Sequence, residues 1–202
     1  MNYLAIDTSG KNLSIVVCNE GKVFSFFDDN CGVKHSDKIM VEIENLIEKA
    51  EYDIKKSDFI ACVVGAGSFT GIRIGVATVK ALCFAYSLPA LSVTSFDTLA
   101  YNEKSGKVLA VIDAGHDGFY VCGYNDNVVE IEPCYIMKEQ LIELEKDYKI
   151  CCSTDIDNVK TKKVSVLDGL INAVSLLSDK RDDNLDNLSP LYVRKSQAEE
   201  GR

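Results

Sequence analysis

The sequence has 202 residues, of which 47% are apolar and 26% are charged, and its formal net charge is −9. That length can bury the core of one large domain or two small ones, and the composition is that of an ordinary soluble globular protein. A chain that binds nucleic acid by itself should carry a basic stripe, whereas the basic residues here are scattered among more numerous acidic ones. No apolar run approaches the roughly 20 residues that span a bilayer, and no signal peptide is visible. We therefore expect a cytoplasmic protein that does not bind membranes and that reaches any nucleic acid through a partner.

Cysteine and histidine usage argues against a metal centre. The eight cysteines form no CxxC pair and show no regular spacing, which indicates neither a zinc site nor a disulfide framework. The only histidines are His35 and His116, far apart in the sequence.

The first half of the chain alternates strands and helices. Apolar segments predict strands over 2–6, 13–18, 22–27, 59–64 and 89–94, and helices over 36–50, 72–86 and 95–101. Ser36 is a plausible N-cap for the first helix. Two hairpin-linked strands beside a strand–helix–strand crossover predict a mixed sheet of the RNase H-like topology.

The same pattern begins again after residue 106. It predicts strands over 107–112, 119–124, 128–132 and 149–153, and helices over 138–148 and 168–178. Each half starts with a strand that ends in an aspartate followed by small residues, at Asp7 and Asp113. We therefore expect an α/β protein of two RNase H-like domains, residues 1–101 and a shorter 102–202, with both carboxylates beside one cleft. This is the architecture of actin and sugar kinases, the ASKHA fold.

A glycine-rich run from Gly65 to Gly75 joins an apolar strand to a helix. In this arrangement backbone N–H groups and a helix N-terminus can face an anion, with Ser68 and Thr70 as hydroxyl caps. The alternative is that the glycines merely permit a tight turn, and the spacing alone leaves both interpretations open.

The helix after this run is apolar or small on nearly every side. Ile72, Val76, Val79 and Cys83 share one side, and Ile74, Ala77, Thr78, Ala81 and Ala85 cover much of the opposite one. Because a surface helix should have one polar face, this helix is either central to its domain or covered by another protein.

Several motifs occur in an order that resembles the TsaB (YeaZ) family over the whole chain. They are Ala5-Ile6-Asp7-Thr8-Ser9, His35-Ser36, the run from Gly65 to Gly75, Ile112-Asp113-Ala114, and Pro190-Leu191-Tyr192-Val193-Arg194 with Ala198-Glu199. The resemblance implies the ASKHA fold and the role of a non-catalytic dimerisation subunit. Such subunits dock on TsaD, which transfers a threonylcarbamoyl group to the adenosine next to the tRNA anticodon, and the ATPase TsaE joins the assembly.

The resemblance also implies roles for individual residues. Positions that match the family's phosphate motifs are read as a vestigial nucleotide site of reduced or no affinity: Asp7, Thr8, Ser9, Gly65, Gly67, Ser68, Thr70, Gly71 and Asp113. The partner interface is expected on the helices 36–50 and 72–86, at Val41, Asn45, Ile74, Thr78, Ala81 and Ala85. His35 is expected to order a helix start rather than to act in catalysis. No catalytic residue, metal or cofactor is expected, because the HxxxH pair of TsaD-type enzymes is missing.

Two departures from the family pattern concern the loops. The usual proline of the glycine loop is Ala66, and the usual arginine after the second aspartate motif is Gly115. The alternative functions are an autonomous ATP-dependent phosphotransferase that uses Asp7 and Asp113, and, less favoured, a glycoprotease-like metallopeptidase. A homodimer in the absence of TsaD is plausible, and Gln197 to Arg202 are expected to become ordered only on a partner.

Overall fold

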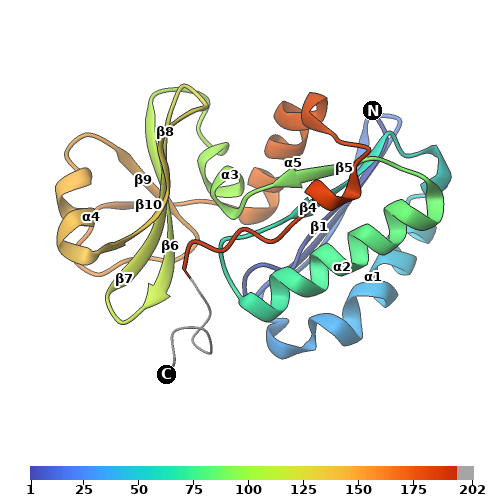
Figure 1. The fold of residues 1–202 in the computed structure, drawn as a ribbon, viewed down its shortest axis with the longest axis horizontal. Coiled ribbons are helices and arrows are strands. Elements are labelled where there is room, and N and C mark those ends of the chain that lie inside the picture. The colour runs from blue at the N-terminus through green and yellow to red at the C-terminus, as the bar shows by residue number, and fades with distance from the viewer. Residues whose placement is uncertain (195–202) are drawn as a thin grey trace. The chain divides into compact units, whose positions relative to one another are not determined.

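The computed structural model of the chain describes residues 1–194. The expectation for Gln197 to Arg202 and the Ala198-Glu199 motif lie outside these residues. The chain folds into two compact units (Figure 1). The first comprises residues 1–94 and 174–191, and the second comprises residues 95–173 with the segment that starts at Tyr192.

The first unit is built on a five-stranded mixed sheet. In sequence its strands are β1 (Tyr3–Asp7), β2 (Leu13–Asn19), β3 (Lys22–Asp28), β4 (Phe59–Val63) and β5 (Ala90–Val93), and their order across the sheet is β3-β2-β1-β4-β5. β1 pairs antiparallel with β2 and parallel with β4. β1 and β4 are buried along their whole length, so they form the centre of the unit.

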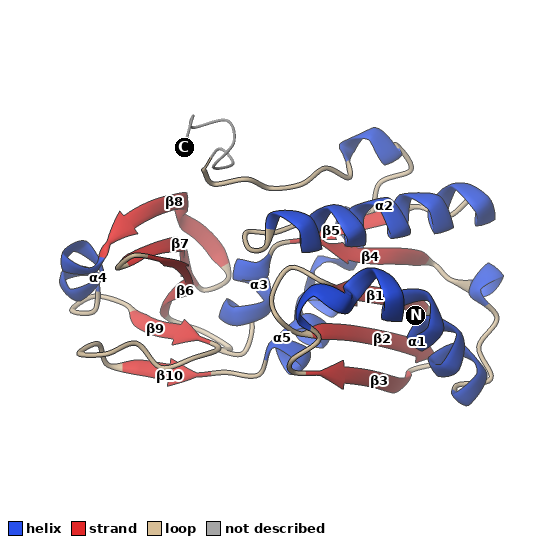
Figure 2. Ribbon diagram, turned by 90° about the horizontal axis from the view of Figure 1, so that it is seen from below, coloured by secondary structure: helices blue, strands red, loops and turns tan. Residues whose placement is uncertain are grey.

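Two long helices cover one face of this sheet, as Figure 2 shows. They are α1 (His35–Lys49), which packs on β2 and β3, and α2 (Phe69–Tyr86), which packs on β4 and β1. Their inner side chains share one apolar core with the sheet, among them Ile39, Ile43, Ile72, Val79, Leu4, Ile6 and Ile60. The spacing of the helix residues in this core is the three-to-four-residue period that the sequence predicts.

The second unit repeats the sheet of the first. Its strands are β6 (Lys107–Gly115), β7 (Gly118–Asn125), β8 (Val128–Met137), β9 (Lys149–Cys152) and β10 (Thr161–Lys163), with the order β8-β7-β6-β9-β10. Helix α4 (Lys138–Leu144) follows β8 as α1 follows β3. The α/β class and the repeated RNase H-like topology are thereby confirmed.

The second unit departs from the first after β9. In the first unit α2 connects β4 to β5, whereas residues 153–160, between β9 and β10, contain no helix. The other helices are α3 (Ser95–Ala100) and α5 (Val166–Leu177).

Some predicted boundaries were wrong. β8 continues to Met137 through Pro133, which an edge strand tolerates because its outer N–H needs no partner. α4 ends at Leu144 rather than at 148, and the short polar β10 was not predicted. Ser36 is not an N-cap, because α1 begins one residue earlier and continues from the 3-10 turn Gly32–Lys34.

Candidate functional site

Asp7 is the last residue of β1 and is 1% exposed. Its Oδ1 atom accepts hydrogen bonds from the backbone N–H of Ser9 at 2.8 Å and from the Ser9 hydroxyl at 2.7 Å. The aspartate therefore holds the turn that follows β1, and Thr8 and Ser9 in this turn are buried as well.

Burial raises the pKa of Asp7 above its ordinary value. The two hydrogen bonds from Ser9 oppose this shift, as do the nearby His35 and a hydrogen bond from the Asn12 side chain. His35 is itself buried, and its Nε2 atom lies 2.9 Å from the carbonyl oxygen of Asn12. This contact fixes the first turn of α1 to the loop after β1, which is the ordering role expected for His35.

The loop after β1 is in direct contact with the start of α2. The N–H of Ser68 donates to the carbonyl oxygen of Ser9 at 2.7 Å, and the Thr8 hydroxyl donates to the carbonyl oxygen of Gly71 at 2.7 Å. Ser68 is the N-cap of α2, and its hydroxyl accepts from the N–H of Gly71 at 3.2 Å.

The loop after β1 and the glycine-rich loop approach each other so closely that Gly67 and Gly71 have no room for a side chain. A Cβ atom on Gly67 would lie 2.2 Å from the carbonyl oxygen of Ser9, and one on Gly71 would lie 2.1 Å from that of Thr8. Both contacts are with backbone, which cannot rotate away. Gly65, with a φ of +115°, adopts a backbone conformation that side chains rarely adopt, and a Cβ there would meet the carbonyl oxygen of Leu191.

Two features of this geometry bear on whether a Mg²⁺–nucleotide could bind here. Mg²⁺ binds carboxylates that can also carry its retained waters, whereas the Asp7 carboxyl group is buried and bonded to Ser9. The amides of Ser68 and Gly71, which could otherwise face a phosphate, are bonded within the chain. Thr70 is exposed on the first turn of α2. Among residues 1–194 no group of three or more His, Cys, Asp or Glu side chains is placed to hold a metal ion.

Asp113 belongs to the second unit, whereas the loops around Asp7 belong to the first. It is exposed near the end of β6, and its Oδ1 atom accepts from the N–H of Gly115 at 2.7 Å. Asp113 thus accepts a hydrogen bond from the backbone two residues further on, as Asp7 does, but in a solvent-exposed position.

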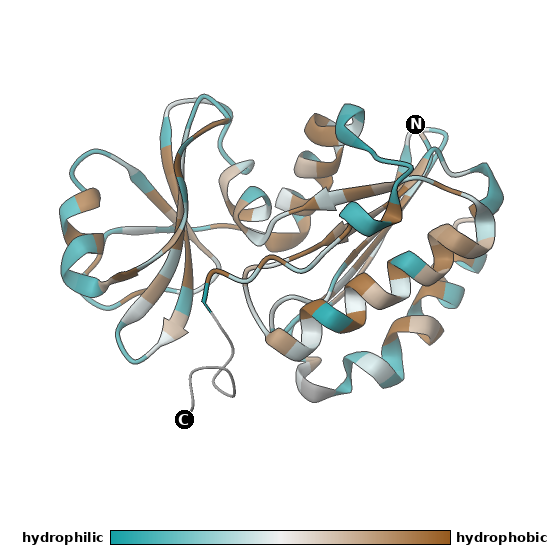
Figure 3. Ribbon diagram, in the orientation of Figure 1, coloured by the Kyte–Doolittle hydropathy of each residue, from teal (hydrophilic) through white to brown (hydrophobic). Residues whose placement is uncertain are grey.

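The outer side of α2 is the second feature of interest. The predicted interface residues Ala81 and Ala85 are exposed, and Ile74 and Thr78 are partly exposed. Figure 3 shows apolar residues recurring along this helix. By length and composition alone α2 is the one helix among residues 1–194 that could cross a membrane, and 33% of it is buried within the protein.

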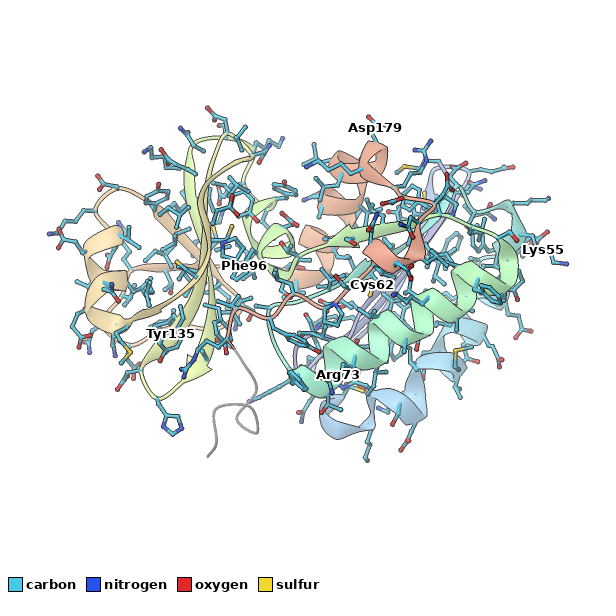
Figure 4. The ribbon with its side chains drawn as sticks, viewed as in Figure 1. Lys55, Cys62, Arg73, Phe96, Tyr135 and Asp179 are labelled. Carbon is cyan, nitrogen blue, oxygen red and sulfur yellow. The ribbon has the colours of Figure 1, made fainter. Side chains whose placement is uncertain are left out.

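The structure adds apolar residues to this surface that the sequence analysis left out. Phe84 is 82% exposed on α2, and Met40 is 43% exposed on α1 beside Val41, which is 53% exposed. Asn45 is exposed one turn further along α1. Phe84 follows Ala77 by seven residues and Ala81 by three, so the helical period was the signal that could have found it. Arg73 marks the N-terminal end of the surface, where its guanidinium group lies 3.9 Å from the centre of the Phe69 ring (Figure 4).

Comparisons with known proteins identify the family of this chain. The sequence model of the TsaD family, described as tRNA N6-adenosine threonylcarbamoyltransferase, matches residues 29–177. The tRNA threonylcarbamoyladenosine biosynthesis protein TsaB of Escherichia coli (strain K12) is 31% identical over 128 residues, which are 61% of this chain and 55% of that protein. TsaB of Bacillus subtilis (strain 168) is 31% identical over 122 residues, 59% of this chain and 53% of that protein. The matched region thus spans about half the length of these relatives.

The solved structure of YeaZ from Pseudomonas aeruginosa has the same fold. It superposes with a TM-score of 0.77 at 22% identity, covering 95% of this chain and 99% of that one. Fold and comparisons together define a protein of two units with an ASKHA-type fold. The chain belongs to the TsaD family, in its TsaB (YeaZ) branch.

Proposed function

We propose that this protein is a non-catalytic subunit that binds a TsaD-type threonylcarbamoyltransferase through the outer side of α2 and the adjacent side of α1. The partner would carry out the transfer of the threonylcarbamoyl group to the adenosine next to the tRNA anticodon. In this proposal tRNA meets the protein only as part of the complex, in the cytoplasm, and TsaE joins the larger assembly.

The observation that carries the proposal is the exposed apolar stripe on α2. We define this stripe by the residues Ile74, Ala77, Thr78, Ala81, Phe84 and Ala85, all of which are exposed or partly exposed. A soluble protein rarely leaves such a continuous apolar surface in water. Small residues along the stripe would let a partner helix approach closely, and Phe84 would supply a large anchor of the kind that dominates interface energies.

The closed site at Asp7 supports the absence of catalysis. The buried carboxyl group and the internally bonded amides of Ser68 and Gly71 form a rigid joint between β1 and α2. The same joint fixes the angle at which α2 leaves the sheet. We therefore infer that the nucleotide-site motif persists in this chain as a support for the docking helix.

Charge variants of the α2 stripe test the proposal. Ala81→Glu and Thr78→Glu place a carboxylate in the centre of the apolar surface, so each should weaken binding of the purified TsaD-type subunit at least about 30-fold, about 2 kcal/mol. Ser175→Glu adds the same charge at an exposed position of α5 and serves as the matched control. Co-purification and the yield of modified tRNA in a reconstituted reaction are the readouts. Normal binding by both stripe variants would show that another surface is used.

A further inference from the structure

The last segment of the first unit lies beside α2. We call residues 182–191 the strap; they follow α5 in the sequence and contain the short 3-10 helix Leu185–Asn187. This short helix contacts α2, and the strap belongs to the red part of the chain in Figure 1. Because α1 lies over β2 and β3, whereas the strap begins at the β5 edge, α2 has α1 on one side and the strap on the other.

The strap is attached at its start to the outer edge of β5. Asp182 and Ala90 exchange two backbone hydrogen bonds, at 2.8 and 2.9 Å, as a bonded antiparallel pair does. The Asp182 carboxylate also accepts hydrogen bonds from the backbone N–H of Asn184 at 2.8 Å and from the side-chain amide of Asn187 at 2.6 Å. The side chain of Asp182 therefore connects the β5 edge to the short helix that contacts α2.

The strap is attached at its end to the strand that precedes α2. The N–H of Leu191 donates to the carbonyl oxygen of Val64 at 2.7 Å, and a Cβ on Gly65 would lie 2.7 Å from the carbonyl oxygen of Leu191. Between the two attachments, Leu188 is 2% exposed and belongs to the same apolar core as Val79 of α2. The strap thus supports α2 along its length, away from the joint at Asp7.

We propose that Asp182 is a positioning residue for docking, and that through the strap it keeps α2 in the orientation that the TsaD-type subunit binds. This inference rests on the proposed function. The joint at Asp7 holds only the first turn of α2, whereas Ala81 lies about three turns further along the helix. A docking helix that is held only at its start must be ordered when the partner binds, and this ordering lowers affinity.

A reversible cross-link tests the role of the strap. Ala90→Cys with Asp182→Cys removes the carboxylate and places two thiols at the bridge, where the α-carbons of a bonded pair are about 5.5 Å apart, within the roughly 4.4–6.8 Å range of disulfides. Cys134→Ser is the background, because Cys134 is the one native cysteine that is not buried. We expect the oxidised form to bind the TsaD-type subunit as the background protein does, and the reduced form to bind it about 5-fold more weakly.

Single substitutions test Asp182 without a cross-link. Asp182→Ala removes the acceptor for Asn184 and Asn187 and should weaken binding of the TsaD-type subunit about 5-fold. Asp182→Asn keeps an acceptor oxygen and should bind nearly as the wild type does. Asp183→Ala is the matched control, because it removes the same charge from the neighbouring exposed position. Equal affinity of Asp182→Ala and Asp183→Ala, or of the oxidised and reduced cross-linked forms, would overturn the proposal.

Hydrogen exchange of the isolated chain tests the strap without any partner. We expect the α2 amides beyond the first two turns to exchange about 5-fold faster in Asp182→Ala, while the amides of β1 exchange as in the wild type. Equal acceleration in α2 and β1 would show a general loss of stability and would contradict a positioning role. A wild-type chain that does not bind the TsaD-type subunit would refute the proposed function, whereas unchanged α2 exchange in Asp182→Ala would refute the role of the strap alone.

Discussion

The carboxyl group of Asp7 is buried with two hydrogen bonds from Ser9, and burial raises its pKa, so ionisation of this group opposes folding. The folded state holds the proton to higher pH than the unfolded state. The stability that the protonated carboxyl group contributes is therefore fully present below the ordinary pKa of an aspartate and is lost as the pH rises through the raised pKa. Asp7→Asn keeps the acceptor for Ser9 and removes the charge.

We predict that Asp7→Asn raises the free energy of unfolding at a pH above the raised pKa of Asp7 and flattens the dependence of that free energy on pH above the ordinary pKa of an aspartate. Urea denaturation across this range measures both. Asp113→Asn is the matched control, because Asp113 makes the same turn contact in an exposed position and its substitution should change little. Asp7→Ala should instead cost about 1–3 kcal/mol, because it removes the acceptor of two buried hydrogen bonds from Ser9. A less stable Asp7→Asn variant would show that the charge itself supports the fold.

Gly71 and Gly75 both lie in α2 and face Thr8, yet their substitution should differ. Alanine favours a helix by about 1 kcal/mol over glycine. At Gly71 the added Cβ would lie 2.1 Å from a backbone oxygen, so we predict a net loss of about 1–3 kcal/mol for Gly71→Ala. At Gly75 the nearest atom would be the Thr8 hydroxyl, at 2.5 Å, a side-chain atom that can move only at the expense of its hydrogen bond to Gly71. Gly75→Ala should therefore cost less than Gly71→Ala in thermal denaturation. Equal losses would argue against the backbone contact as the cause.

At the scale of elements, α2 combines a buried side with an exposed apolar one. Phe84 is 82% exposed in the isolated chain, so truncation of its side chain removes few packing contacts. We predict that Phe84→Ala changes the free energy of unfolding by no more than about 0.5 kcal/mol. In the complex it should lower affinity for the TsaD-type subunit about 30-fold, because a truncated aromatic anchor costs about 2 kcal/mol. Val128→Ala truncates an exposed apolar side chain of β8 and is the control. Equal binding by both variants would remove Phe84 from the interface.

The sequence predicted the presence of strands and helices better than the residues at which they begin and end. Both sheets follow from apolar runs, hairpin turns and a repeated strand–aspartate pattern, because each apolar strand needs a buried position. The N-cap at Ser36 was wrong, because a 3-10 turn packed through Cys31 and His35 sets the helix start. β10 contains Thr161, Lys162 and Lys163 and carries no apolar signal. Its pairing with β9 depends on tertiary context.

The site was predictable in part. The sequence indicated that Asp7, Ser9 and the glycine loop form one site; in the structure hydrogen bonds join Ser9 to Asp7 and to Ser68. It left open whether the loop faces an anion or only permits a turn. That choice depends on which acceptors the backbone N–H groups of Ser68 and Gly71 bind, and the sequence pattern alone does not identify these acceptors.

At the scale of the whole molecule, the two units share one strand order but differ in the segment that joins their last two parallel strands. The first keeps α2 between its last two parallel strands, with an apolar outer stripe. The second has residues 153–160, without a helix, at the equivalent place. In our account the first unit therefore carries the binding surface.

The most direct test of this account is isothermal titration calorimetry of the chain with ATP and then with the purified TsaD-type subunit of the same organism. The account predicts no heat with ATP–Mg²⁺, tight binding of the subunit, and loss of that binding in Ala81→Glu but not in Ser175→Glu. Clear ATP binding by the isolated chain that is lost in Asp7→Ala would contradict it and would favour a phosphotransferase.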